Sequence, residues 1–251
     1  MRNQTIEIPT ADGVAEAYVT SPGDGRYPPV LFYIDAIGLR PRIEDMADRI
    51  AGWGYTVMAP NVFYRDGTAA ALAPTEDLRV PENREKFFEV AMKRVRAHTA
   101  EQAFGDLDAY IAALQALPTA RAGDIGVTGY CMGGRLALRA ACRRPDVIAA
   151  TGVFHAGGLV TQAGDSPHLA VANARAELFF GHADGDRSNP PEAIATLEAA
   201  LDEAELTYTS EVFEGASHGY TMADSSAYDK QATERHFREL EALLARNLSR
   251  T

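Results

Sequence analysis

The sequence predicts an α/β fold with a mostly parallel central sheet and helices on both of its faces. Strand-like and helix-like patterns alternate along the chain, an order that favours parallel strands joined by crossover helices. Residues 30–34 (VLFYI) form a short, wholly apolar run, as expected for a strand that is buried on both faces. The 251 residues contain no internal repeat and no linker-like composition. A single domain over residues 1–251 is therefore expected.

The individual elements are predicted from local signals. Asp12-Gly13 lies between the apolar patterns of residues 6–8 and 14–19 and indicates a hairpin turn. Pro41 is suited to open a helix, which the apolar periodicity extends to about Gly52. Further strands are expected at residues 55–59, 124–128, 147–154, 177–180 and 206–213, and further helices at residues 100–117, 132–142, 190–204 and 228–248.

One long segment interrupts this alternation. Residues 61–97 are charged, weakly periodic and carry Pro74 and Pro81. A plain loop of that length is uncommon in a compact domain. We therefore expect a cap-like excursion over residues 61–99, with a helix at residues 82–96.

The composition limits the possible partners. With 24 Lys and Arg against 35 Asp and Glu, the net charge is −11, and such a surface repels phosphate backbones and anionic headgroups. Neither nucleic acid nor a membrane is expected as a partner, and no apolar run approaches the ~20 residues that cross a bilayer. An anionic substrate would have to be captured by a few local cations. Two cysteines cannot make a disulfide framework, so a reducing, cytoplasmic compartment is expected.

The sharpest motif is Gly129–Gly134 (GYCMGG), which lies between a predicted strand and a predicted helix. A tight strand-to-helix turn lifts its central side chain, here Cys131, out of the sheet. The helix N-terminus would also stabilise a thiolate there. The alternative is that the glycines only allow close packing, as in a dinucleotide-binding turn. That motif needs glycine at position 131 and normally follows an early strand, so Cys131 is predicted to be a nucleophile.

A nucleophile needs a base, and six histidines are available. His218 lies in residues 214–220 (EGASHGY), directly after the last predicted strand, with a neighbouring glycine that leaves the imidazole room to move. In folds with such an elbow the catalytic residues follow the order nucleophile, acid, base along the chain. His218 meets this order and is predicted to be the base.

The acid is expected after a strand between Cys131 and His218, where Asp184 and Asp186 both qualify. Asp184 lies three residues after Gly181, close to the predicted strand end, where a rigid carboxylate would orient an imidazole. We therefore predict Asp184 as the acid. Asp186 is alternatively a helix cap or a surface residue.

The remaining polar features concern the oxyanion and metals. One oxyanion amide is expected from Met132 and the other from the loop after residues 30–34, with Ala36 preferred and Ile37 next. His182 and His155 also follow strands, but no HExxH or similar spacing supports a metal site. No metal and no cofactor are expected. The other histidines are predicted to lie at the surface: His98, His168 and His236.

With these residues identified, the chain resembles the dienelactone hydrolase family over nearly its whole length. The resemblance rests on the cysteine elbow, on the Gly181–Asp184 run (GHAD) and on His218-Gly219. It implies an α/β-hydrolase fold and hydrolysis of small lactones or activated esters, without a cofactor, through Cys131, His218 and Asp184. Members of this family open the lactone ring of dienelactone, a small unsaturated carboxylate.

The resemblance also implies substrate-binding residues. Asp35 occupies the place of a carboxylate that contacts the resting thiol, although the founding members carry the longer glutamate there. Arg84 is the best match to a cap-helix arginine that holds the substrate carboxylate. A second family arginine follows the catalytic histidine by four residues, where this chain has Met222. This departure puts dienelactone itself in doubt but leaves ester or lactone hydrolysis intact.

Two other functions use the same residues. One is a general carboxylesterase or thioesterase, and the other is a non-catalytic redox sensor with Cys131 as a reactive thiol. The presence of His218 and Asp184 argues against a sensor. The expected partner is a small-molecule lactone or ester, and the expected assembly is a monomer or a small homo-oligomer.

Overall fold

The structure, a computed structural model, describes residues 1–248 and contains one eight-stranded sheet in the order β1-β2-β4-β3-β5-β6-β7-β8. The strands from β4 to β8 in that order run parallel, whereas β1 and β2 are antiparallel. The bounds are β1 Arg2–Thr10, β2 Gly13–Ser21, β3 Pro29–Tyr33, β4 Thr56–Pro60, β5 Ile125–Tyr130, β6 Ile148–Phe154, β7 Glu177–Ala183 and β8 Tyr208–Phe213.

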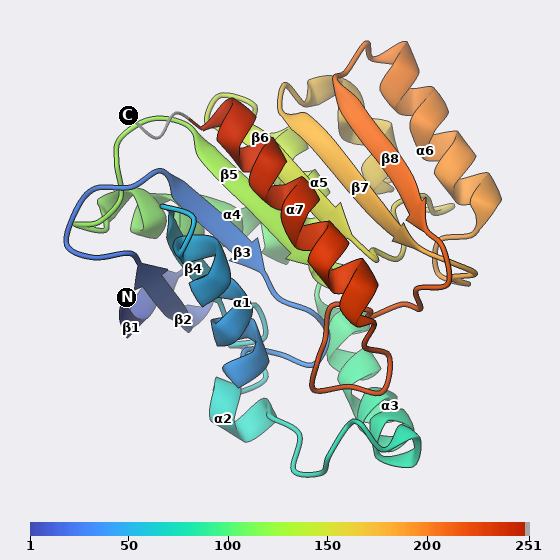
Figure 1. Cartoon of the computed structure of the whole chain (residues 1–251), viewed down its shortest axis with the longest axis horizontal. Coiled ribbons are helices and arrows are strands. Elements are labelled where there is room, and N and C mark those ends of the chain that lie inside the picture. Colours follow the sequence, from blue (N-terminus) through green and yellow to red (C-terminus); the bar gives the residue numbers. More distant parts are fainter. Residues whose placement is uncertain (249–251) are drawn as a thin grey trace.

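Helices cover both faces of the sheet (Figure 1). The helices α1 and α7 pack on one face, and α4 and α5 pack on the other. The bounds are α1 Pro41–Ala51, α2 Ala69–Leu72, α3 Pro81–Ala97, α4 Ala100–Ala116, α5 Met132–Arg143, α6 Pro191–Glu203 and α7 Lys230–Asn247, with a 3₁₀ helix η1 at Pro167–Asn173. The predicted fold class is therefore confirmed.

Local chemistry accounts for these elements. The hairpin signal holds, because Thr10 pairs with Gly13 and Gly13 takes a φ of 150° that favours glycine. All residues of β3, β4 and β5 are buried, as expected for central parallel strands. Thr99 caps α4 in a reciprocal capping box with Gln102. These signals position the sheet whose carboxyl edge carries the candidate site.

The segment between β4 and α4 contains α2 and α3, so the predicted helix at residues 82–96 is confirmed. Figure 1 shows α3 beyond the end of the sheet toward which the parallel strands point. The prediction for β7 was too short, because the strand continues to Ala183 rather than ending at Phe180. This extension decides which carboxylate reaches the site.

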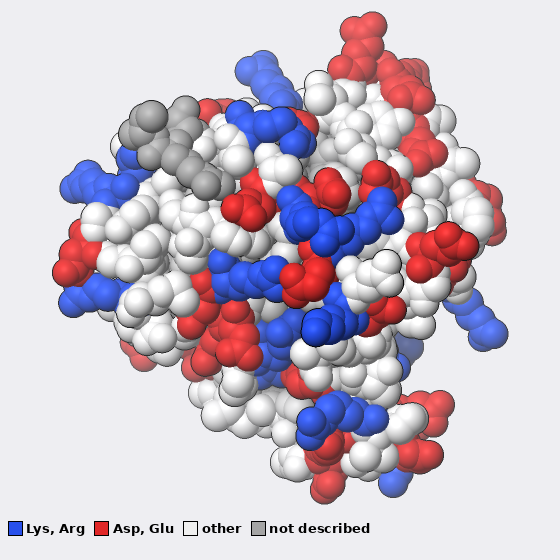
Figure 2. All heavy atoms as spheres, viewed as in Figure 1, with Lys and Arg blue, Asp and Glu red and all other residues white. Residues whose placement is uncertain are grey.

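The surface carries both signs of charge. On the face in Figure 2, basic and acidic side chains are interspersed rather than separated into large single-sign areas. Across residues 1–248, no helix combines the length and the apolar character that a bilayer crossing requires.

Candidate active site

Cys131 lies at the turn from β5 into α5, in a strained backbone conformation. Its φ of 57° and ψ of −120° belong to a region that a non-glycine residue adopts at a cost of about 1–3 kcal/mol. A side chain on Gly129 would place its Cβ 2.1 Å from the Gly133 carbonyl oxygen, and one on Gly133 would lie 2.3 Å from the Ile34 oxygen. The glycines therefore let α5 start directly against β5 and β3, and the turn presents Cys131 at the edge of the sheet.

His218 contacts Cys131 from the loop that follows β8. Its Nε2 lies 3.0 Å from the Cys131 Sγ, and its Nδ1 lies 2.6 Å from Asp186 Oδ2. Ser188 donates from its backbone amide and its hydroxyl to the other oxygen, Asp186 Oδ1. The three side chains therefore form a continuous row from a fixed carboxylate to a sulfur atom.

The carboxylate that contacts His218 is Asp186 rather than Asp184, the residue that the sequence favoured as the acid. Because β7 continues to Ala183, Asp184 lies at the strand end, where its side chain is exposed and accepts a hydrogen bond from the Gly215 amide at 2.9 Å. Gly185 then adopts a left-handed φ of 60°. That left-handed turn separates the two carboxylates, and the second of them, Asp186, contacts His218.

The electrostatics of this row favour a charged imidazole. Burial by itself lowers the pKa of His218, but the charge of Cys131 and the hydrogen bond to Asp186 outweigh it and raise the pKa to about 10. Burial by itself raises the pKa of Asp186, but the hydrogen bonds from His218 and Ser188 lower it to about 2. The protonated ring is therefore held between a carboxylate and a sulfur atom, with an Nε2 proton available for transfer.

The other histidines after strands have structural partners. His155 is buried, with Nε2 2.8 Å from Thr221 Oγ1, and burial, followed by the charge of His218, holds its pKa far below the usual range. Burial lowers the pKa of His182 to about 4, and its ring contacts Asn189 and Ser210. Both are thus neutral side chains within hydrogen-bonded packing.

The surface prediction for His236 was wrong. Its ring is fully buried, with Nε2 2.9 Å from the Tyr130 hydroxyl, and burial lowers its pKa to about 3. Within residues 1–248, no cluster of three or more histidine, cysteine, aspartate or glutamate side chains is arranged to hold a metal ion.

A cavity of about 420 Å³ opens at Cys131 and His218. One wall consists of apolar side chains of α3 at helical spacing, Phe88, Met92 and Val95. The cationic lining residues are Arg84, Arg135 and Arg187. A larger hollow of about 820 Å³ lies along α5, but neither Cys131 nor His218 lines it. The smaller cavity is therefore the one at which chemistry is expected.

The predicted cap arginine, Arg84, lies in this cavity. Its Nε donates to Ser225 Oγ at 3.1 Å, and its guanidinium lies over the Phe88 ring, 4.8 Å from the centroid. Another arginine of the same helix, Arg94, donates to the carbonyl oxygens of Ala36 and Ile37 at 3.0 and 3.1 Å. Helix α3 therefore both lines the cavity and holds the loop that follows β3.

That loop contains the expected oxyanion amide. The Ile37 amide donates to Asp35 Oδ1 at 3.1 Å, so it is already engaged, which leaves Ala36 as the preferred donor. Met132 is the first residue of α5, where a backbone amide has no partner within its own helix. The close approach of Gly133 to Ile34 brings the two segments together beside Cys131.

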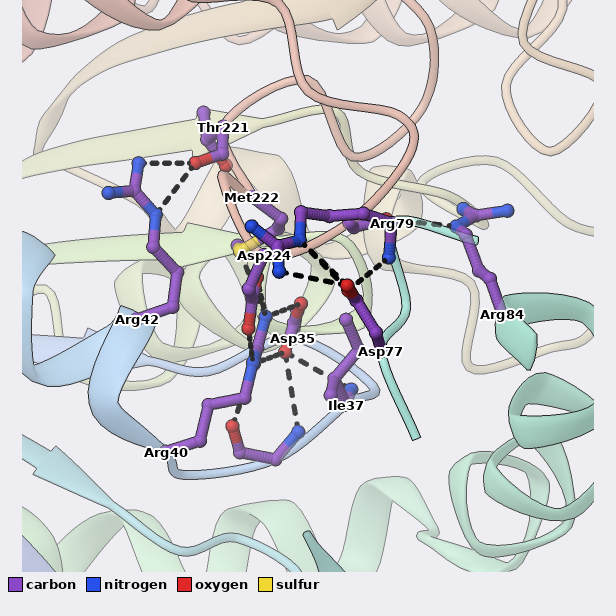
Figure 3. Close-up of polar contacts among 12 residues, drawn as sticks. Asp35, Ile37, Arg40, Arg42, Asp77, Arg79, Arg84, Thr221, Met222 and Asp224 are labelled. Carbon is purple, nitrogen blue, oxygen red and sulfur yellow. Dashed lines mark hydrogen bonds and ion pairs between the residues drawn. The ribbon is translucent and has the colours of Figure 1, made fainter. Parts of the chain in front are cut away.

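The expected contact between Asp35 and Cys131 is not formed. Asp35 Oδ1 instead accepts from Arg40 at 2.7 Å, and Asp224 Oδ2 accepts from the same guanidinium at 2.5 Å. The Arg40 Nη2 also lies 3.4 Å from the Met222 sulfur, at the position of the missing family arginine. Figure 3 shows Arg40 enclosed between the two carboxylates, with Arg84 apart from them. Sequence reasoning missed this pairing, because it joins residues 184 positions apart.

The strand order, the strained elbow after β5 and the histidine loop after β8 define an α/β-hydrolase. Comparison with family models narrows the class: the model of the dienelactone hydrolase family matches residues 15–248, and the chain belongs to that family. It is therefore a hydrolase of the dienelactone hydrolase type, as the sequence resemblance implied.

Individual relatives agree with this placement. A "Putative carboxymethylenebutenolidase" from Methylorubrum extorquens is 29% identical over 223 residues, which cover 86% of this chain and 71% of the relative. "Carboxymethylenebutenolidase 1" from Cupriavidus pinatubonensis is 29% identical over 144 residues, 57% of this chain and 58% of that protein. The crystal structure of a "Putative Dienelactone Hydrolase" from Klebsiella pneumoniae has a TM-score of 0.82 at 22% identity and covers 97% of this chain and 98% of that one.

Proposed function

We propose that this chain hydrolyses small lactones or activated esters through a thioester on Cys131, with His218 as the acid and base and Asp186 as its orienting carboxylate. The observation that carries the proposal is the unbroken row of contacts, 3.0 Å from sulfur to Nε2 and 2.6 Å from Nδ1 to the carboxylate. The row ends at a cavity of about 420 Å³. A nucleophile, a base and an orienting group in hydrogen-bond reach are the parts that covalent catalysis requires.

In the first half-reaction, the Cys131 thiolate attacks the carbonyl carbon and forms a carbon–sulfur bond. The carbonyl oxygen becomes an oxyanion that the amides of Met132 and Ala36 would bind. When the tetrahedral intermediate collapses, the bond to the leaving oxygen breaks. The His218 imidazolium donates its Nε2 proton to that oxygen, and the products are a thioester and a neutral imidazole.

In the second half-reaction, His218 takes a proton from water, and the resulting hydroxide attacks the thioester. The carbon–sulfur bond then breaks and returns Cys131 as a thiolate beside the imidazolium, while the product leaves as a carboxylic acid. Asp186 keeps the same hydrogen bond to Nδ1 throughout, which orients the ring and stabilises its charged form.

The chemistry of sulfur narrows the substrate class. A thiolate is itself a good leaving group, so the tetrahedral intermediate expels sulfur unless the leaving oxygen is stabilised. Enol lactones and aryl esters meet this condition, and amides do not. The apolar wall of Phe88, Met92 and Val95 suits a compact hydrocarbon body, and we propose that Arg84 contributes positive charge near it.

The test is a panel of enol lactones and aryl esters assayed with wild type, Cys131→Ala and Cys142→Ala. Cys142 is the matched control, because it is buried in α5 and burial raises its pKa to about 12. We expect Cys131→Ala to abolish turnover while its circular dichroism stays native, and mass spectrometry to detect an acyl adduct on wild type and Cys142→Ala. Retention of more than a few per cent of turnover by Cys131→Ala would exclude the thioester route. Peroxide reactivity without any turnover would favour the redox sensor.

A further inference from the structure

Arg94 of α3 holds the loop after β3 through hydrogen bonds to its backbone. A single guanidinium nitrogen, Nη2, donates to the carbonyl oxygens of Ala36 and Ile37 at 3.0 and 3.1 Å. The central carbon of the guanidinium lies 4.9 Å from the ring centroid of Phe63 and 5.4 Å from that of Phe87. The cation is therefore fixed in position by two carbonyl dipoles and two aromatic rings.

No close anion neutralises the charge of Arg94. Among residues 1–248, no acidic side chain forms an ion pair with it. Burial lowers its pKa, and the charges of Asp66 and Asp35 oppose that effect. Asp66 is exposed, and Asp35 is already paired with Arg40. Arg94 lies in the last turn of α3, where the helix dipole favours a cation. A positive charge thus lies against the loop that follows β3.

The contacts of this loop leave one backbone amide available. The amides of Ile37 and Gly38 both donate to Asp35 Oδ1, and the carbonyls of Ala36 and Ile37 accept from Arg94. In the part of the chain that the structure describes, by contrast, the amide of Ala36 has no hydrogen-bond partner. The surrounding contacts therefore hold the loop and leave free the amide that is expected to bind the oxyanion.

We propose that Arg94 is a positioning residue for the oxyanion: it holds the Ala36 amide in place and adds positive charge beside the loop where negative charge develops. This role rests on the proposed hydrolysis through Cys131. A preorganised donor stabilises the transition state because it need not reorient as the charge develops, and a cation stabilises the same charge at longer range. Arg94 does not line the cavity, so it acts through the loop rather than by contact with the substrate.

The first experiment compares wild type with Arg94→Met, which removes the charge and the donors of the side chain. With an aryl ester as substrate, kcat should fall about 10- to 100-fold, less than the direct loss of an oxyanion donor would cause. KM should stay within about twofold, because both half-reactions pass through an oxyanion and no cavity contact is lost. The control is Lys93→Met, which removes a positive charge from an exposed neighbour on the same helix, outside the cavity. Its kcat should stay at the wild-type value.

Arg94→Lys tests whether the contacts with the loop cause the effect. One nitrogen makes both hydrogen bonds in the wild type, and a lysine ammonium has the same charge and three donors. Arg94→Lys should therefore recover most of the kcat that Arg94→Met loses. Equal losses in the two variants would contradict the proposed role.

A second experiment does not depend on hydrolysis. An aryl trifluoromethyl ketone adds reversibly to a thiolate and forms a tetrahedral adduct with an oxyanion, whereas iodoacetamide alkylates the same sulfur without forming one. The Kd of the ketone, measured by its protection of Cys131 against iodoacetamide, should rise about 10- to 100-fold in Arg94→Met. The alkylation rate without ketone should stay unchanged, with Cys131→Ala as the blank. If wild type hydrolysed no ester but showed this pattern, the proposed function would fail and the role of Arg94 would stand.

Three further results would overturn the assignment of Arg94. An unchanged kcat and an unchanged ketone Kd in Arg94→Met would mean that Arg94 does not act on the oxyanion. A higher KM at the wild-type kcat would mean that it only shapes the cavity. Equal losses in ketone binding and in alkylation would mean that the substitution disturbs Cys131 itself.

Discussion

Two buried carboxylates lie at the carboxyl edge of the sheet, Asp35 after β3 and Asp186 after β7, and each is bonded to a cationic partner. The distances are similar, 2.7 Å from Arg40 to Asp35 and 2.6 Å from His218 to Asp186. The surroundings differ. Asp224 closes the far side of Arg40, whose side chain is 3% exposed, whereas His218 is 28% exposed and its second nitrogen faces Cys131. The Arg40 guanidinium is enclosed by two carboxylates, whereas the row through His218 ends at the reactive sulfur of Cys131.

The Arg40 network also fixes the loops that carry the reactive row. Arg40 joins Asp35, whose carboxylate also orders the amides of Ile37 and Gly38, to Asp224 in the loop after β8. Figure 3 shows these two loops held together through the single guanidinium. The loop that would bind the oxyanion and the loop that carries His218 are therefore fixed relative to each other. The ion pairs of Arg40 thus hold the two loops in position, whereas the row from Asp186 through His218 to Cys131 is suited to move protons.

The largest effect is expected from removing His218, the central residue of the row from Asp186 to Cys131. His218→Ala should lower kcat/KM for an aryl ester on the order of 10³-fold or more, because the imidazole acts in both half-reactions. Steady-state kinetics measure this loss, and circular dichroism checks that the fold is kept. Near-normal rates in this variant would shift the role of the base to His155 or His182.

Removing Arg40 should instead lower the stability of the fold. Arg40→Leu leaves the buried Asp35 carboxylate without its cation and also removes the partner of the partly exposed Asp224. The change should lower the free energy of unfolding by about 3–5 kcal/mol. Urea denaturation measures the change. The matched control is Arg79→Leu, which breaks the exposed pair with Asp77 and should leave stability nearly unchanged. If Arg40→Leu were as stable as the control, the network would not hold the loops.

The roles of the two carboxylates after β7, Asp184 and Asp186, can be distinguished by changing each one to asparagine. Asp186→Asn should lower kcat/KM on the order of 10²-fold, because an amide does not stabilise the imidazolium. Asp184→Asn should stay close to wild type, since Asp184 contacts the Gly215 amide rather than His218. The opposite ranking of the two variants would restore Asp184 as the acid.

A smaller effect follows from the acidity of Asp186. The pKa of Asp186 is lowered to about 2 in the folded chain from about 3.9 in the unfolded chain. At pH values above the unfolded-state pKa, the ionised carboxylate therefore contributes about 2 kcal/mol to the stability of the fold. That contribution is lost as the pH falls from about 4 through 2. Urea titrations at pH 5 and at lower pH should therefore show the stability gap between wild type and Asp186→Asn shrinking. A gap that does not change with pH would mean that His218 does not lower this pKa.

The sequence by itself determined the fold class, the family, the elbow and the histidine that faces it. Each of these follows from a local pattern: a wholly apolar run for a central strand, glycines where two backbones meet, and the order of motifs along the chain. The positions of Cys131 and His218 beside each other could be predicted, because the carboxyl ends of parallel strands meet at one edge of the sheet.

Only the tertiary structure decided which charged side chains meet. Asp184 and Asp186 are equivalent in sequence, and the choice depends on where β7 ends and on the left-handed turn at Gly185. Asp35 pairs with Arg40 rather than contacting Cys131, and Arg40 also pairs with Asp224 across 184 positions. No local pattern encodes that pairing. Backbone propensity acts over a few residues, whereas the partner of a charge is set by long-range packing.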